Sequence, residues 1–150
     1  MKQNNNLHIA ALTLALGLLA TAPALGAVEI ESARAELRTD DPGALAAYFV
    51  LRNTTTHELE LLKAVASGAD RVEFKQRSYD ADNRPHVWPL AKFELQPGDT
   101  LRLSAESRFL RISGFTQPPR AGDRVSLTLV FEDEPPVVVE LRVGAAPAAR

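Results

Sequence analysis

Apolar and polar residues alternate with a period of two in the last third of the chain. From residue 125 to 131 every second position holds a valine, leucine or phenylalanine, and the same alternation returns over residues 137–143. Glu134-Pro135-Pro136 separates the two runs, and prolines do not continue a central strand. Because alternation places one apolar set against a core, the pattern predicts two strands that pair as a hairpin.

Further short runs rich in valine, leucine, phenylalanine and threonine recur at intervals of about ten residues, separated by Pro, Gly, Asn and Asp. No long stretch places apolar residues at helical spacing. The pattern predicts one all-β domain, either a sandwich or a barrel. The other expected strands cover residues 29–38, 45–53, 59–66, 71–77, 92–96, 100–104 and 108–115, with turns at 40–43, 53–56, 80–83, 96–99 and 120–123.

The amino terminus has the shape of a secretory signal. Lys2 precedes a polar run and then an uncharged apolar stretch over residues 7–19. Small residues follow, as a signal peptidase requires, and we predict cleavage after Ala27, with Ala24 and Ala22 as alternative sites. An uncleaved membrane anchor is the competing interpretation, against which the short apolar core and a proline within the segment both argue.

The predicted organisation is a signal peptide over residues 1–27, a β domain over 28–143 and a disordered tail over 144–150. Cleavage removes one lysine and no acid, which leaves 16 Lys and Arg against 19 Asp and Glu, a net charge of about −3. Nucleic acid and anionic membranes are therefore not expected partners. Without cysteine, the chain has no site for amino-terminal lipid and needs no disulfide. We expect a periplasmic or secreted protein with no membrane insertion after cleavage.

Residues that could carry catalysis are few and scattered. The mature chain has two histidines, His57 and His86, in separate predicted loops and without the glycines of a nucleophile elbow. The adjacent acids Asp40 and Asp41 are typical of a solvated turn. Residues 80–83 resemble the start of a calcium loop but lack its glycine and distal glutamate, so a plain turn is predicted. The sequence does not predict an enzyme.

Six short segments match one family of exported β proteins. They are Ala46-Ala47-Tyr48-Phe49-Val50-Leu51-Arg52-Asn53, Arg71-Val72-Glu73-Phe74, Pro89-Leu90, Phe93-Glu94-Leu95-Gln96-Pro97-Gly98-Asp99, Ile112-Ser113-Gly114-Phe115 and Gly122-Asp123-Arg124-Val125-Ser126-Leu127-Thr128-Leu129-Val130-Phe131. From residue 46 to 143 the chain thus resembles the periplasmic copper chaperones of the PCu(A)C family. The resemblance implies a single cupredoxin-like Greek-key β-sandwich or barrel, and delivery of copper to the Cu(A) site of cytochrome oxidase.

The copper ligands of that family have no counterpart in this sequence. The resemblance implies a histidine, a methionine twelve positions later, and a His-X-Met triplet after a further twenty-one residues. This spacing falls on Lys75, Val87, Phe109 and Arg111 without insertion or deletion. None of the four supplies the thioether or imidazole that cuprous copper prefers, and two are cations. We therefore expect no metal at these positions and no cofactor, copper being implied by the resemblance only.

His86 lies next to one of these positions and is a weak candidate for a relocated copper ligand. His57, Asp80 or Asp82 could assist it. Lone loop histidines are more often solvated or hydrogen-bonded, and a tight copper site needs several convergent ligands. The alternative function is therefore a copper chaperone that uses unconventional ligands such as His86.

The same region could instead form a basic patch. Period-two counting turns Phe109 and Arg111 away from the core and Leu110 and Ile112 toward it. The candidate patch residues are Lys75, Arg77, Arg84, Trp88, Arg108, Phe109 and Arg111. Such a mixture suits a carboxylate-bearing ligand or a protein partner, whereas the competing interpretation is solvated strand residues balanced by Glu73, Glu106 and Asp82. The sequence favours a metal-independent or weakly metal-binding periplasmic module that binds a protein partner or a small anionic ligand.

Overall fold

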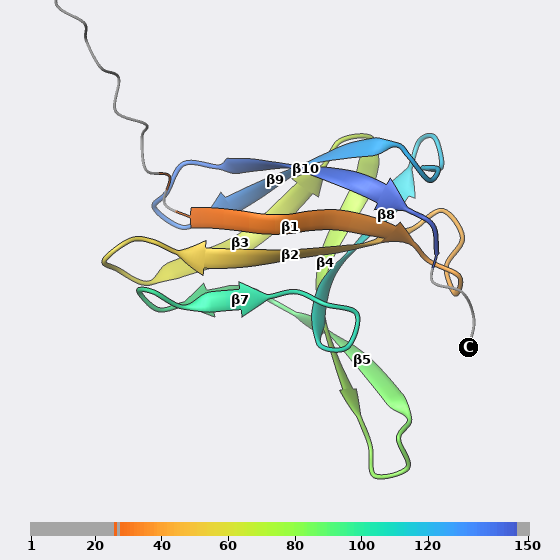
Figure 1. The fold of residues 1–150 in the computed structure, drawn as a ribbon, viewed down its shortest axis with the longest axis horizontal. Coiled ribbons are helices and arrows are strands. Elements are labelled where there is room, and N and C mark those ends of the chain that lie inside the picture. Colours follow the sequence, from red (N-terminus) through yellow and green to blue (C-terminus); the bar gives the residue numbers. More distant parts are fainter. Residues whose placement is uncertain (1–25, 27, 147–150) are drawn as a thin grey trace, which may run out of the picture.

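The computed structural model of the chain describes residue 26 and residues 28–146 and is built of β-strands (Figure 1). The ten strands are β1 (Val28–Leu37), β2 (Leu45–Asn53), β3 (Leu59–Ala66), β4 (Ala69–Tyr79), β5 (Pro85–Leu90), β6 (Phe93–Leu95), β7 (Thr100–Arg102), β8 (Arg108–Phe115), β9 (Arg124–Phe131) and β10 (Val137–Gly144). The all-β prediction is confirmed. The described part of the chain contains no helix long and apolar enough to cross a bilayer.

The strands form one hydrogen-bonded path in the order β5-β4-β8-β2-β1-β10-β9-β3-β6, with β7 paired to β2. β1 runs parallel to β10 and antiparallel to β2. β3 also lies beside β4, so the path curls back on itself. The single-domain, cupredoxin-like sandwich implied by the family resemblance is thereby confirmed. Figure 1 shows β1, β2 and β10 in front of β3 and β9.

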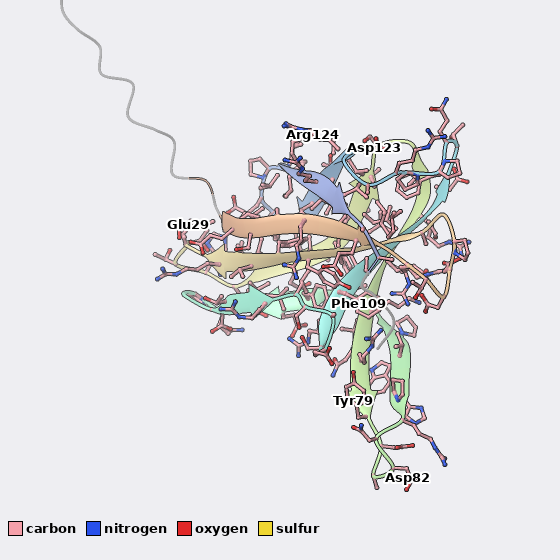
Figure 2. All side chains as sticks on the ribbon, turned by 45° about the vertical axis from the view of Figure 1, so that its right-hand side comes forward. Glu29, Tyr79, Asp82, Phe109, Asp123 and Arg124 are labelled. Atoms are coloured by element: carbon pink, nitrogen blue, oxygen red, sulfur yellow. The ribbon has the colours of Figure 1, made fainter. Side chains whose placement is uncertain are left out.

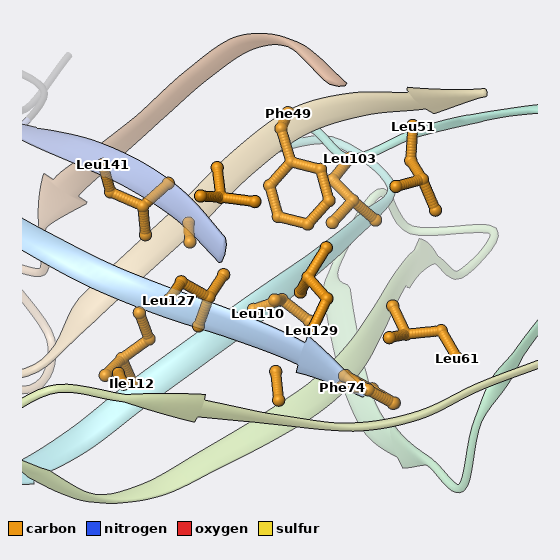
Figure 3. Close-up of a cluster of buried hydrophobic side chains, with 14 of the residues drawn as sticks. Phe49, Leu51, Leu61, Phe74, Leu103, Leu110, Ile112, Leu127, Leu129 and Leu141 are labelled. Carbon is orange, nitrogen blue, oxygen red and sulfur yellow. The ribbon is translucent and has the colours of Figure 1, made fainter. Parts of the chain in front are cut away.

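The core lies between the inward faces of these strands. Phe49 of β2, Leu110 of β8, Leu127 and Leu129 of β9 and Leu141 of β10 are almost completely buried and point toward one another (Figure 3). Full burial of a side chain of this size stabilises a fold by about 1.5–3 kcal/mol. The predicted hairpin is confirmed, since β9 and β10 pair antiparallel with alternate residues buried.

Asn53 ends β2 and fixes the turn that follows it. Its side chain is fully buried, and its Nδ2 donates to the carbonyl of His57 at 2.8 Å and to that of Leu95 at 3.0 Å. Its Oδ1 accepts from the backbone N–H of Thr55 at 2.9 Å. Because a buried amide without partners is costly, these bonds tie the β2–β3 turn to β6. The turn predicted at residues 53–56 is confirmed.

A long hairpin, β4 with β5, projects away from the sandwich (Figure 1). β5 was not among the predicted strands, and the placement of His86 in a loop is wrong, because it lies on β5 together with Trp88. Pro85 and Pro89 interrupt the residue pattern, yet an edge strand tolerates proline. At the turn, the Oδ1 of Asp80 accepts the backbone N–H groups of residues 82 and 84, which confirms a plain turn there.

The ends of the predicted domain meet the limits of the described residues. The signal peptide over 1–27 lies outside them except for residue 26, and so does the tail from residue 147. Gly144 belongs to β10, where it pairs with Glu36 of β1. The tail predicted to begin at residue 144 therefore begins with a strand residue, because the parallel ladder extends one position further than the apolar alternation indicates.

Candidate functional site

The four positions that the family resemblance assigns to metal ligands belong to one part of the sheet. They lie on three neighbouring strands, with Lys75 on β4, Val87 on β5, and Phe109 and Arg111 on β8. Lys75 is directly opposite Phe109, and Val87 is opposite the next outward residue of β4, Arg77. All four therefore share one side of these strands, which we call the outer face. Leu110 and Ile112 face the core with no exposed surface, as the alternation predicts.

Both cations at these positions are held by carboxylates. The Nζ of Lys75 lies 3.0 Å from one oxygen of Glu73, and the Nη1 of Arg111 lies 2.8 Å from the other. The Nη2 of Arg111 also contacts the carboxylate of Asp41. The hydrogen bond from Lys75, with that from Arg111, holds the pKa of Glu73 below its usual value, and contact with Asp41 raises the pKa of Arg111. These side chains form a half-buried ion-pair cluster.

Phe109 lies on the outer-face side of β8 but is buried, so it is not an exposed contact residue. Only 2% of its surface is exposed, and it packs with Ala46, Tyr48 and Ala105 in a small apolar cluster separate from the main core. The guanidinium groups of Arg38 and Arg77 each lie 5.4 Å from the centroid of its ring. Figure 2 places Phe109 where the β4–β5 hairpin leaves the sandwich. Two cations therefore cover the ring.

These four residues do not fit a copper ion. A protonated lysine and an arginine have no lone pair to donate, and valine and phenylalanine have no ligating atom. Within the described part of the chain, one group of three ligating side chains occurs, Glu58, Glu60 and Glu94. Lys92 lies 2.7 Å from Glu60 and 2.9 Å from Glu94, so an ammonium already pairs with two of the three carboxylates.

His57 lies in the β2–β3 turn and His86 on β5, and each has its own carboxylate. The Nε2 of His86 is 3.2 Å from the Oδ2 of Asp80, and the Nε2 of His57 is 3.0 Å from Glu134. Neither histidine belongs to a group of three ligating side chains among the described residues. The structure therefore brings His86 together with Asp80 but not with His57.

The seven residues of the predicted basic patch do not form one surface. Lys75, Arg77, Phe109 and Arg111 share the outer face. Trp88 and Arg108 both lie opposite Gln76 of β4, which places them on the other side of the same strands. Arg84 is at the tip of the hairpin beside Asp82, at 3.7 Å. The prediction of a single patch around Phe109 and Trp88 is wrong, because a strand at the position of β5 turns Trp88 away.

A pocket on the outer face includes residues that sequence reasoning missed. It has a volume of about 260 Å³, and its walls include Glu36 and Arg38 from β1 and its end, Tyr48 of β2, Arg77 of β4 and Ala105 before β8. Arg38 and Tyr48 carry no local sequence signal for a site. They adjoin Phe109 only because β1, β2 and β8 are neighbours in the sheet.

Comparison with known proteins places this geometry in a family. A solved structure of the copper-bound PCuAC domain from PmoF2 matches with a TM-score of 0.64 at 17% identity, covering 81% of this chain and 96% of that chain. The apo PmoF2 PCuAC domain matches with a TM-score of 0.64 at 20% identity, covering 84% and 95%. Cu(I)-bound DR1885 from Deinococcus radiodurans matches with a TM-score of 0.56 at 19% identity, covering 83% and 81%. At such identities the likeness shows the fold.

The resemblance to PCu(A)C domains is confirmed by these structures. A comparison with curated protein sequences found no match. A family model described as lipoprotein LpqE-like matches residues 28–143, most of the chain. The chain therefore belongs to the LpqE-like family.

Proposed function

We propose that this protein is an exported, non-enzymatic binding module that does not hold copper at the family's ligand positions. Its partner is a protein or a small anionic ligand met on the outer face. The observation that carries the proposal is the ion-pair cluster of Lys75, Arg111, Glu73 and Asp41, in which Lys75 and Arg111 occupy two of the four positions that the resemblance assigns to ligands. A cation entering there would have to displace two fixed positive charges.

Export is supported by the apolar stretch at residues 7–19 and by the lipoprotein description of the family. Sequencing of the exported protein should find a new amino terminus at residue 28, or at 25 or 23 if an alternative site is used. A chain that keeps residues 1–27 and stays with the membrane fraction would instead support the anchor interpretation.

The second candidate is a copper chaperone with unconventional ligands. Its support is the contact of His86 with Asp80 and the copper-bound state of two structural neighbours. A single imidazole with one carboxylate is a poor site for Cu(I), which prefers soft donors. The observation on the ion-pair cluster therefore favours the binding module.

Titration with Cu(I) under anaerobic conditions, in competition with a chelator, separates the two candidates. We expect affinity no tighter than micromolar and no difference between the native protein and His86→Ala. Stoichiometric binding tighter than micromolar that disappears in His86→Ala would establish the second candidate. His57→Ala serves as the matched control, because it removes an imidazole that is also paired with a carboxylate but lies in the β2–β3 turn.

A further inference from the structure

The arginines that line the outer-face pocket differ in whether they have a carboxylate partner. Two guanidinium groups line it, those of Arg38 and Arg77. Arg38 contacts Asp40, and Glu36 lies 3.3 Å from Arg34, which is not a lining residue. Among the residues that the structure describes, Arg77 has no carboxylate partner and donates its Nη1 to the carbonyl of Ala105 at 2.8 Å. Of the four charged side chains that line the pocket, Glu36 pairs with Arg34 and Asp40 with Arg38, which leaves Arg77 without a carboxylate in the described part of the chain.

Two donors beside the pocket also lack acceptors. The Nε atoms of Arg38 and Arg77 are buried, and no atom of the described residues accepts a hydrogen bond from either. A buried N–H without an acceptor is unfavourable, so an added acceptor at this place would be stabilised. In Arg77, the unpaired Nε belongs to a planar fork that suits the two oxygens of a carboxylate.

The guanidinium groups are fixed in position before any ligand binds. Arg38 and Arg77 both lie over the ring of Phe109, and Arg34 lies 5.0 Å from the centroid of the Tyr48 ring. Stacking on aromatic rings limits the rotamers of these long side chains, which lowers the entropy lost on binding. Attraction to Arg77 also contributes, after the larger effect of Arg38, to lowering the pKa of Asp40, so the charge of Arg77 acts within the pocket.

We propose that this pocket binds a single carboxylate group through Arg77, with Ala46, Tyr48 and Ala105 in contact with a short apolar stem. The inference rests on the proposed function, because it names the chemistry that the outer face recognises. Only one negative charge is accommodated, since Glu36 and Asp40 at the edge of the pocket repel a second. The volume of about 260 Å³ suits a small acid or one acidic side chain.

The test uses the exported protein and two probes, propionate and the blocked peptide acetyl-Ala-Glu-Ala-amide. In an NMR titration we expect the Nε–H resonance of Arg77 to move downfield and to exchange more slowly as either probe binds, with Kd on the order of 1 mM. Propionamide, the uncharged isostere, should have no effect. If neither carboxylate moves this resonance, the proposal is overturned whatever the behaviour of any variant.

Variants then identify the residue. Arg77→Met keeps the apolar stem and should weaken propionate binding at least tenfold, whereas Arg77→Lys keeps the charge without the fork and should weaken it less. Arg108→Met is the matched control, because it removes an arginine from the other side of the same strands and should bind as the native protein does. Equal losses in Arg77→Met and Arg108→Met would mean general charge attraction and would overturn the assignment.

The two probes distinguish the sources of the carboxylate. Tighter binding of the peptide indicates an acidic side chain of a protein partner, whereas binding of propionate alone indicates a small free acid. The copper titration remains independent of these results. Tight copper binding together with the Arg77 response would overturn the proposed function and leave the carboxylate pocket. The absence of both would overturn the carboxylate pocket and leave the proposed function.

Discussion

Glu73 is the residue on which the outer face depends electrostatically. One carboxylate oxygen binds Lys75 of its own strand and the other binds Arg111 of the neighbouring strand. Its side chain is 25% exposed, so these contacts are screened less than those of a surface pair. Bridging two cations lowers the charge repulsion that Lys75 and Arg111 would otherwise exert on each other across β4 and β8.

Glu73→Gln should destabilise the protein in a pH-dependent manner. The folded-state pKa of Glu73 is lowered from 4.5, so its contribution is fully present above that pH and is lost as the pH falls through the folded-state pKa. At pH 7 we expect a loss of about 1–2 kcal/mol in the free energy of unfolding. Urea denaturation at pH 7 and pH 3 measures the difference between variant and native protein, which should shrink at pH 3.

Glu94→Gln is the control for that experiment. Glu94 also pairs with a lysine, Lys92, but its side chain is 54% exposed. An exposed pair of this kind contributes little, so the variant should differ from the native protein by less than about 1 kcal/mol at either pH. A Glu73→Gln effect that is the same at both pH values would show that the ionised form of Glu73 is not what stabilises the face.

Gly114 is required on β8 for two reasons, and Gly114→Ala should therefore be strongly destabilising. Its φ is +71°, and a Cβ there would lie 2.8 Å from the Cβ of Asp70. We expect a loss of at least about 2 kcal/mol, from the left-handed backbone together with the overlap. Thermal denaturation followed by circular dichroism measures it.

Two further variants separate the causes at Gly114. Gly43→Ala has a positive φ of 90° with nothing within 4 Å, so it should show the backbone cost alone. Asp70→Gly removes the atom that the new Cβ would meet and should recover part of the loss in the double variant. If Gly114→Ala is no worse than Gly43→Ala, the close approach to Asp70 is unimportant.

At the scale of elements, the β4–β5 hairpin joins two different environments. Where β4 pairs with β8, Phe74 is buried and packs against Phe93, with the ring centroids 4.9 Å apart. Figure 2 shows Tyr79 on the projecting part of the hairpin. Tyr79, Val87 and Trp88 are each at least 40% exposed. The base of the hairpin thus belongs to the core, and its outer half is an arm with two solvent-facing sides.

This difference predicts unequal effects of truncating its aromatic residues. Phe74→Ala should cost about 3–5 kcal/mol, because it removes a buried ring and leaves a cavity. Trp88→Ala should cost less than about 1 kcal/mol, because the side chain has few neighbours to lose. Urea denaturation followed by far-ultraviolet circular dichroism gives both values. A large loss in Trp88→Ala would mean that the outer half of the hairpin supports the fold.

Sequence patterns predict most of this fold but only part of the site. The alternation of apolar and polar residues predicted the buried face of β9 and β10, and it predicted that Leu110 and Ile112 of β8 face the core. The reason is that a half-buried strand imposes a period of two. β5 was not predicted, because its residues are exposed on both sides and so show no alternation of apolar and polar positions.

Contacts between distant segments leave no sequence pattern at all. Arg111 pairs with Asp41, which is 70 positions away, and Arg77 bonds to the carbonyl of Ala105. The period-two alternation correctly predicted that Phe109 points away from the main core. It could not show that a second small apolar cluster buries the ring on that side. Both features depend on which strands become neighbours, and that choice is made by the whole sheet.

At the scale of the whole molecule, the sheet order places the four positions that the resemblance assigns to ligands on adjacent strands. Because β5, β4 and β8 are consecutive in the hydrogen-bonded path, residues 75, 87, 109 and 111 share one face whatever side chains they carry. The frame and the chemistry of the site are therefore separable. This separation can be tested by supplying the donors that the frame lacks.

The quadruple variant Lys75→His, Val87→Met, Phe109→His and Arg111→Met should gain Cu(I) binding. It introduces two imidazoles and two thioethers on one face of the sheet and removes two cations, while Glu73 and Asp41 remain to attract the ion. Arg38 and Arg77 still lie beside position 109 and oppose the metal, by about 1–4 kcal/mol each if they approach to about 4 Å. We expect one Cu(I) per chain, bound at least a hundredfold more tightly than by the native protein.

The matched control is Lys75→Gln, Val87→Leu, Phe109→Leu and Arg111→Gln, which makes the same change of charge without adding a donor atom. Chelator competition compares the two variants once circular dichroism has shown that both keep the β fold. Equal, weak binding by two folded variants would show that these positions do not converge closely enough to chelate. The assignment of Lys75, Val87, Phe109 and Arg111 to the family's ligand positions would then fail, even though the fold itself is shared.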